Sequence, residues 1–143
     1  MQADTTHMGW TSVLWIGAND CNVGFPDTIA NIGAAVDELE TNQFIIMTII
    51  NADNALTAVG GEYYDELIAV NDYIITTYPN NHIDIRGYLL SEYDPAVDLD
   101  VIDYELGQTP FSLRIASDNV HLNNYGNALV IKRIRDFIAE KGW

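Results

Sequence analysis

The sequence predicts an α/β domain built around a parallel β-sheet. Short apolar segments of strand length alternate along the chain with longer segments that repeat apolar residues at intervals of three and four. The short segments are typical of strands buried on both faces, and the longer ones of helices with a single buried face. Strands and helices that alternate in this way form parallel sheets, because each helix returns the chain to the start of the next strand.

Three segments have the composition of buried strands. Residues 12–16 (SVLWI) end at Gly17, residues 44–50 (FIIMTII) form the longest apolar run, and residues 82–85 form a short third segment. All three have strand length, and the first two are nearly continuous in apolar side chains. We therefore expect a parallel sheet of about three strands, which is few for this class of fold.

Helices are expected between and after these strands. The first begins near Pro26, a residue that suits the first turn of a helix, and the second covers residues 62–78 before Pro79 ends it. Residues 88–118 contain two prolines and a glycine, and we expect them to form a long irregular loop. The last helix is expected over residues 123–141. The predicted buried face of the first helix consists of Ile29, Ile32, Val36 and Leu39.

The composition is that of a globular domain with a strongly acidic surface. Apolar residues make up 48% of the 143-residue chain, and its 21 acidic and 6 basic residues give a formal net charge of -15. Such a surface repels phosphate groups, so neither nucleic acid nor an anionic membrane is an expected partner. Cys21 is the single cysteine, which excludes an internal disulfide and a zinc site of the CxxC type.

The sequence predicts neither a membrane segment nor a secretory signal. No apolar run approaches bilayer length, and the first ten residues lack the basic and apolar parts of a signal peptide. We expect a soluble protein and leave its compartment open. Residues 1–11 are interpreted as an N-terminal extension or the remnant of a truncation, and residues 12–143 as the domain itself.

A cluster of acidic residues lies within the expected long loop. Carboxylates grouped on a loop are able to bind Ca²⁺, but the spacing here lacks the turn glycine and the terminal glutamate of an EF-hand. We therefore predict a solvated acidic loop and no metal site. The residues are Asp94, Asp98, Asp100, Asp103 and Glu105.

The first motif that could carry chemistry is the tetrapeptide 17–20 (GAND), directly after the first predicted strand. Ligands of open parallel sheets bind at the carboxyl ends of the strands, so this tetrapeptide occupies the expected place for a site. The side-chain amide of Asn19 is able to donate a hydrogen bond to a developing oxyanion. Taken alone, the motif more simply fits a turn in which Asn19 and Asp20 satisfy local backbone groups.

The second motif is the tetrapeptide 118–121 (DNVH), just ahead of the last predicted helix. An acid three residues before a histidine is able to hold one nitrogen of the imidazole and leave the other free as a general base. Taken alone, Asp118 is more simply a turn residue and His121 an ordinary, partly buried histidine.

Together the two motifs resemble the SGNH/GDSL hydrolase family, in which a strand ends in G-x-N-D and a later D-x-x-H precedes the final helix. Residues 12–20 (SVLWIGAND) are similar to that family's third block, and residues 117–138 (SDNVHLNNYGNALVIKRIRDFI) to its last. The resemblance covers nearly all of the chain from Ser12 onward. It implies a three-layer, flavodoxin-like parallel sheet, here truncated to about three strands with flanking helices.

The resemblance also assigns roles to individual residues. Asn19 and Gly17 are expected at the oxyanion hole. His121 is expected to act first as general base and then as general acid, while Asp118 orients and stabilises it.

The remaining residues of the two motifs, Asp20 and Asn119, are expected to contact substrate. Reactions of the family are hydrolyses of carboxylic esters, including small acyl esters and acetyl groups on sugars, without a metal or organic cofactor. We therefore expect no cofactor and a small acyl ester or an acetylated carbohydrate as substrate.

The nucleophile of the family is missing from this sequence. It is the serine of a G-D-S segment after the first strand, and no such segment occurs here. None of the serines present is a convincing replacement, although Ser91 and Ser112 stay open. The serines are Ser12, Ser91, Ser112 and Ser117. Cys21, the only thiol, is interpreted as a small buried apolar side chain.

Two expectations follow from the missing segment. The chain alone is expected to be inactive or nearly so, because the members of a catalytic triad act as a unit. The strand 12–16 is expected to be an unpaired apolar edge, which invites pairing with a second copy, a missing N-terminal half or a larger assembly. The alternative interpretation is a catalytically silent SGNH-like module with a structural or binding role in such an assembly.

Overall fold

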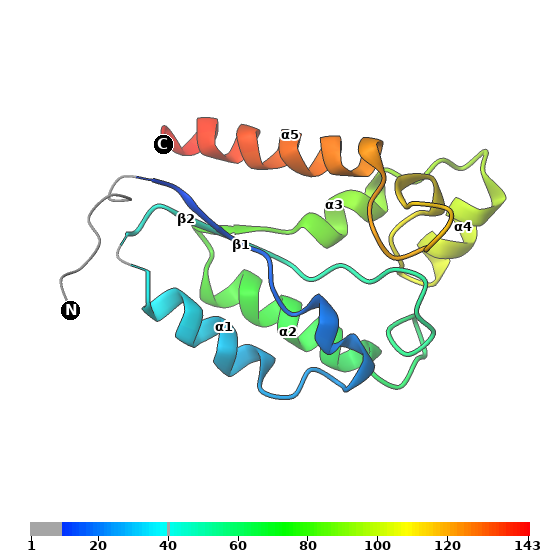
Figure 1. Cartoon of the computed structure of the whole chain (residues 1–143), viewed down its shortest axis with the longest axis horizontal. Helices are drawn as coiled ribbons and strands as arrows, with labels where there is room; N and C mark the ends of the chain where they lie inside the picture. The colour runs from blue at the N-terminus through cyan, green and yellow to red at the C-terminus, as the bar shows by residue number, and fades with distance from the viewer. Residues whose placement is uncertain (1–9, 40) are drawn as a thin grey trace.

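The computed structural model describes residues 10–39 and 41–143, which form an α/β domain with helices on both faces of a three-stranded parallel sheet (Figure 1). The strands are β1 (Ser12–Leu14), β2 (Phe44–Met47) and β3 (His82–Ile83), and they lie in that order across the sheet. The predicted fold class, a parallel sheet of about three strands with flanking helices, is thus confirmed. Of the predicted N-terminal extension, residues 1–9 lie outside the described residues.

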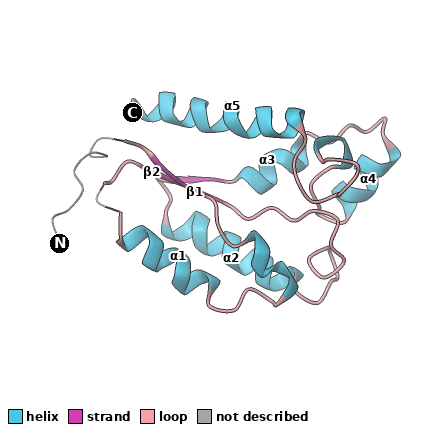
Figure 2. Cartoon of the chain, viewed as in Figure 1, coloured by secondary structure: helices cyan, strands magenta, loops and turns pink. Residues whose placement is uncertain are grey.

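The sheet lies between two layers of helices. Figure 2 shows its strands, in magenta, with α5 (Asn124–Lys141) on one side and α1 (Thr28–Asp37) and α2 (Tyr64–Thr77) on the other. Successive side chains of a strand point to opposite faces, so β2 supplies both cores. Ile45 belongs to the core under α5, and Ile46 to the core under α1 and α2.

β1 is the edge strand next to β2, with Leu14 opposite Ile46. The sequence predicted a longer strand, 12–16, buried on both faces. The structure corrects this prediction, because β1 ends at Leu14 and Val13 is 43% exposed. The side chain of Val13 is exposed because no strand pairs with the outer side of β1 among the described residues.

α1 buries less of its predicted apolar face than the sequence indicated. Ile32 is fully buried, but Ile29 is 39% exposed and Leu39 lies beyond the end of the helix. The reason is topological. α1 connects β1 to β2 and so lies toward the open edge of the sheet.

Asp84 ends β3 and begins the next helix, α3 (Ile85–Ser91). Its carboxylate Oδ1 accepts hydrogen bonds from the backbone N–H of Gly87 at 2.9 Å and from Thr48 Oγ1 at 3.0 Å. The first of these is the contact that caps a helix N-terminus. β3 therefore stops short of the predicted 82–85.

The segment 88–118, predicted as a long irregular loop, is helical over about half of its length. It contains most of α3, all of α4 (Asp98–Glu105) and the 3-10 turn η3 (Phe111–Leu113). The prediction of a solvated acidic loop is also wrong for its central part, because Asp100 is 0% and Asp103 is 7% exposed. Both carboxylates find donors inside the protein. Asp100 accepts bonds from Ser112, and Asp103 pairs with Arg114.

The last helix has nearly the bounds that the sequence predicted. The side chain of Asn123 caps α5 by accepting hydrogen bonds from the backbone N–H groups of Tyr125 and Gly126. Gly142, at φ 69°, follows the C-terminal end of the helix. No helix of the described residues is both long and apolar enough to cross a membrane.

Candidate functional site

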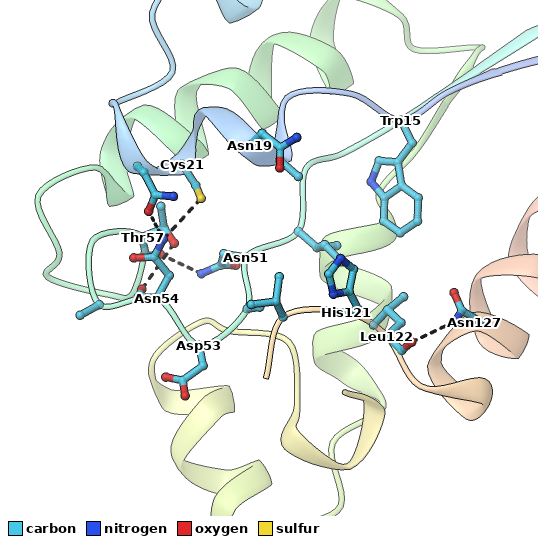
Figure 3. A pocket seen from close by; sticks show the side chains of 16 residues that line it. Trp15, Asn19, Cys21, Asn51, Asp53, Asn54, Thr57, His121, Leu122 and Asn127 are labelled. Carbon is cyan, nitrogen blue, oxygen red and sulfur yellow. Dashed lines mark hydrogen bonds between the residues drawn. The ribbon is translucent and has the colours of Figure 1, made fainter. Parts of the chain in front are cut away.

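A pocket of about 790 Å³ opens beyond the carboxyl ends of β1 and β2 (Figure 3). Three segments line it, drawn from residues 15–22, 50–57 and 120–127. The first two follow neighbouring parallel strands, and the third leads into the first turn of α5. This is the position at which open α/β sheets bind ligands.

Gly17 makes the turn from β1 into the pocket. Its φ is 100°, and a Cβ at this residue would lie 2.5 Å from Cδ1 of Ile49. Glycine alone combines this conformation with so close an approach. The turn leads into the 3-10 helix η2 (Ala18–Asn22), which places Asn19 in the pocket wall.

Asp20 has a different surrounding from Asn19. Its carboxylate Oδ2 accepts a hydrogen bond from Thr28 Oγ1 at 2.6 Å, which ties η2 to the first residue of α1. Neither Asp20 nor Gly17 lines the pocket. The substrate contact expected for Asp20 and the oxyanion role expected for Gly17 therefore stay predictions.

Asp118 and His121 form the pair that the sequence predicted. Oδ2 of Asp118 lies 3.0 Å from Nδ1 of His121. Nδ1–H of a neutral imidazole donates in such a pair, which leaves Nε2 as the basic nitrogen. His121 lines the pocket, and its side chain is 76% exposed. The pair is therefore open to any molecule that enters.

The backbone of the same turn also stabilises the Asp118 carboxylate. Oδ1 accepts hydrogen bonds from the N–H groups of Val120 at 2.9 Å and His121 at 3.1 Å. These two bonds, first that of Val120, and the further bond from the imidazole hold the pKa of Asp118 below its usual value. Asp118 is thus ionised at neutral pH and suited to stabilise an imidazolium.

Asn119, predicted to contact substrate, turns toward the protein interior. It adopts φ 56°, its carbonyl oxygen accepts a hydrogen bond from Arg114 Nη1 at 2.9 Å, and its Nδ2 donates to Asp53 at 3.3 Å. It does not line the pocket. These contacts give Asn119 a structural role in the turn, while its contact with substrate stays a prediction.

No serine is found among the described residues that line the pocket. Ser12 begins β1 at the opposite end of the strand from the pocket, Ser112 Oγ donates to Asp100 at 2.6 Å, and Ser91 Oγ donates to Tyr88 O at 2.7 Å. Ser117 lies in the turn that precedes His121, outside the lining.

The described part of the lining nevertheless includes one thiol and one hydroxyl. Cys21 Sγ lies 3.4 Å from Asn54 Nδ2, and the buried Thr57 has its Oγ1 3.5 Å from Asn54 O. In Figure 3 both residues are drawn beside Asn54, whereas His121 and Trp15 are drawn together across the opening. Neither Cys21 nor Thr57 forms a hydrogen bond with His121; both have their partners in the segment that follows β2.

Sequence reasoning missed the second wall of the pocket, residues 50–57. Asn51 is 3% exposed, donates from Nδ2 to Thr57 O at 2.8 Å and accepts from Arg86 Nε at 3.2 Å. Asp53, two residues further on, is the only carboxylate among the lining residues that the structure describes. The signal was available, because the polar run 51–54 (NADN) follows the second strand just as the GAND motif follows the first.

The lining is polar but carries little charge. It contains several asparagine amides and the indole of Trp15, whose Nε1 donates to Thr48 O at 3.1 Å, and no lysine or arginine is among its described residues. Among the described residues, no three histidine, cysteine, aspartate or glutamate side chains are grouped so as to hold a metal ion.

The chain is similar to part of a curated phage protein. Over 144 residues the chain is 31% identical to the tail spike protein of Salmonella phage epsilon15, an alignment that covers 92% of this chain. The chain spans only 13% of the length of that protein. No family model matches the chain, and no solved structure matches it.

Proposed function

We propose that this chain carries the oxyanion and acid/base part of an SGNH-type carboxylic-ester hydrolase site. The observation that carries the proposal is that Asn19, which follows β1, and His121, which precedes α5, line one pocket. Asp118 holds Nδ1 of that histidine. Residues far apart in the sequence thus meet at the carboxyl end of the sheet with the groups that acyl transfer needs.

In the proposed reaction, Nε2 of His121 takes a proton from an attacking hydroxyl. The hydroxyl oxygen forms a bond to the ester carbonyl carbon, and the carbonyl oxygen becomes an oxyanion to which the Asn19 amide donates. Asp118 stabilises the imidazolium formed. When the ester C–O bond breaks, His121 returns the proton to the leaving alcohol, and the acyl group stays on the attacking oxygen. Water then attacks this acyl group with His121 again as the base, which releases the carboxylic acid and restores the hydroxyl.

The proposed substrate is a neutral ester, an acyl or acetyl ester that includes acetylated carbohydrate. A pocket without lysine or arginine on a chain of formal charge -15 disfavours anionic substrates. Amide groups and an indole face suit the hydroxyls and the apolar ring faces of sugars.

We propose further that the attacking hydroxyl comes from a strand that pairs beside β1. Val13 and Ile16 are 43% and 39% exposed at this edge, and the pocket opens at its carboxyl end. A parallel strand there would end next to Asn19. A twofold-related second copy would pair antiparallel and would place its own pocket at the opposite end. The match to a short part of a much longer tail spike protein supports a chain that works inside a larger assembly.

The hydrolase proposal is tested by the rate of p-nitrophenyl acetate hydrolysis. The isolated chain is expected to turn over weakly, through His121 acting as general base toward water. His121→Ala should remove this activity, and His82→Ala, a histidine that bonds Tyr78 O outside the pocket, should not. Equal rates for wild type and His121→Ala would contradict the proposal for this chain.

The second candidate is a catalytically silent binding or structural module. The absence of a serine from the lining favours it, as does the match to one part of a tail spike protein. It predicts that an O-acetylated sugar binds with unchanged affinity to His121→Ala and is never hydrolysed. Binding measured by calorimetry alongside the rates separates the two candidates.

A further inference from the structure

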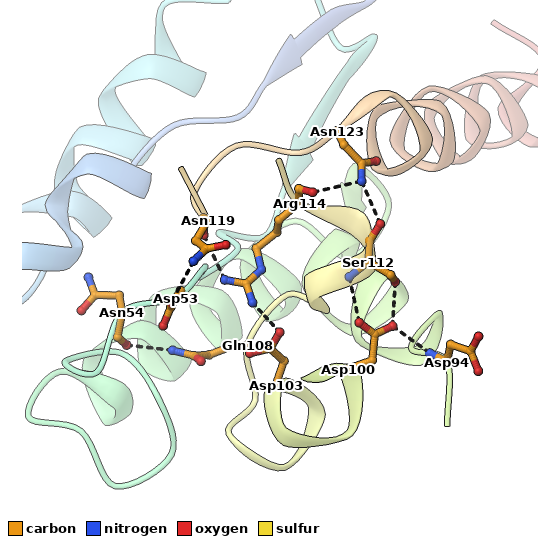
Figure 4. Close-up of polar contacts among 10 residues, drawn as sticks. All are labelled: Asp53, Asn54, Asp94, Asp100, Asp103, Gln108, Ser112, Arg114, Asn119 and Asn123. Carbon is orange, nitrogen blue, oxygen red and sulfur yellow. Dashed lines mark hydrogen bonds and ion pairs between the residues drawn. The ribbon is translucent and has the colours of Figure 1, made fainter. Parts of the chain in front are cut away.

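Arg114 and Asp103 form a charged pair in the interior, behind the turn that bears His121. Arg114 is 4% exposed, and its Nη2 donates to Oδ2 of Asp103 on α4. Its Nη1 donates to the carbonyl oxygen of Asn119 at 2.9 Å. Figure 4 shows the Arg114 guanidinium between Asp103 on α4 and Asn119 in the turn that precedes His121. The fork of Arg114 therefore joins a helix outside the pocket to the turn 115–121.

From this geometry we propose that Arg114 and Asp103 are positioning residues for His121, which they hold at the pocket by fixing the backbone of Asn119. The proposal rests on the proposed function for the chemical role of His121. The contact it describes is independent of that role.

The Asn119 carbonyl is the point at which the turn is fixed. Asn119 adopts a left-handed φ of 56°, which reverses the chain between Asp118 and His121. The reversal allows the Asp118 carboxylate to accept from the N–H groups of Val120 and His121. A rotation of the peptide between Asn119 and Val120 would break the bond to Arg114 and turn the N–H of Val120 away from Asp118, and the next N–H, that of His121, would shift with it. Arg114 therefore acts on His121 through the backbone.

The same carbonyl also links the turn to the floor of the pocket. Asp53 N donates to Asn119 O at 3.3 Å, while Asn119 Nδ2 donates to Asp53 Oδ2 at 3.3 Å. Asp53 itself lines the pocket beside Asn51. The bonds from Arg114 on one side and Asp53 on the other define where His121 lies relative to the wall that follows β2.

A buried charged pair is a poor device for stability alone. Burial raises the pKa of Asp103, and the neighbouring Arg114 opposes that rise. Replacing such a pair by apolar residues is often neutral or stabilising, because both charges have lost their hydration. Arg114 Nε and Asn119 Oδ1 are buried without a partner among the described residues, so the guanidinium is placed for its two Nη contacts. Orientation of the turn accounts for the pair better than stability does.

The test is a double variant, Asp103→Leu with Arg114→Met, which removes both charges and leaves neither one unpaired. We expect it to fold cooperatively. By NMR, the amides of Val120 and His121 should exchange at least about tenfold faster than in wild type, and the pKa of the Asp118 carboxyl should rise toward its usual value. Ile74→Ala, in the core under α2, is the control for a general loss of stability. It should leave the Asp118 titration unchanged.

Two results would overturn the proposal. One is a folded double variant with wild-type amide exchange and a wild-type Asp118 titration. If the double variant does not fold, the same two measurements are made on Arg114→Lys. One ammonium group cannot replace the two guanidinium nitrogens that bond Asp103 and Asn119 O, so the same changes are expected. Wild-type signals in that variant would be the second contradiction. Neither reading requires turnover, so the positioning role and the hydrolase proposal succeed or fail separately.

Discussion

The carboxylate of Asp118 is held by three hydrogen bonds within its own turn, from two backbone N–H groups and the imidazole of His121. They hold its pKa below the usual value in the folded protein. A group of this kind contributes stability above the unfolded pKa of about 4, and the contribution is lost as the pH falls through the folded pKa. We predict that Asp118→Ala lowers the urea midpoint at pH 7 and has a much smaller effect near pH 2. A difference between the two proteins that is independent of pH would contradict this origin.

Gly17 gives a second prediction at the scale of one residue. Gly17→Ala combines a positive φ with a methyl group 2.5 Å from Ile49 Cδ1, and we expect a loss of about 1–3 kcal/mol in unfolding free energy. Ile49→Val removes the contacting carbon. The double variant Gly17→Ala/Ile49→Val should therefore be less destabilised than the sum of the two single variants, measured by urea unfolding. Strict additivity would show that the close approach is not the cause.

At the scale of elements, the cap of α5 connects the helix to the site. Asn123 accepts from the N–H groups of Tyr125 and Gly126, and it donates from Nδ2 to the carbonyl oxygens of Ser112 and Arg114. Asn123→Ala should lower the unfolding free energy by about 1–2 kcal/mol. Asn124→Ala, one exposed residue further on, is the matched control and should have little effect. Equal losses in thermal melts of the two variants would argue against a capping role.

The elements predictable from the sequence were those marked by apolar periodicity. β2, α2 and α5 were found because their apolar residues repeat with strand or helix spacing over long segments. α3 and α4 were missed because their signals are polar. Asp84 ends a strand by capping a helix, and Asp100 and Asp103 look like a solvated acidic stretch until their buried donors are known. A pairing with a residue elsewhere in the fold, such as Arg114, cannot be read from local sequence.

The candidate site, like the fold, could be predicted only in part from the sequence. The motifs 17–20 and 118–121 lie at element boundaries, and the structure brings Asn19 and His121 to one pocket. Asp20 and Asn119 belong to the same motifs, but the structure directs them to Thr28 and Arg114. A short motif identifies a turn, and only the packing around the turn decides which of its side chains face the pocket.

At the scale of the whole molecule, the open edge of β1 predicts association. A strand with unpaired backbone groups and exposed apolar side chains tends to pair with another strand. We expect the isolated chain to associate as its concentration rises, measured by size-exclusion chromatography with light scattering. Val13→Lys should weaken this association, whereas Ile131→Lys, at a 65% exposed position on α5, should not. A folded monomer at every concentration would contradict self-association at this edge.

The central claim is that Asn19 and His121 form one site for an acyl group. It is tested most directly by titrating the chain with acetamide, a neutral mimic of the acetyl ester that the proposed reaction would cleave, and following both side chains by NMR. The account predicts that the Asn19 amide and the His121 imidazole shift along a single binding curve, while the resonances of His82, outside the pocket, stay fixed. A curve for His121 without a matching change at Asn19, or no change at either, would contradict it.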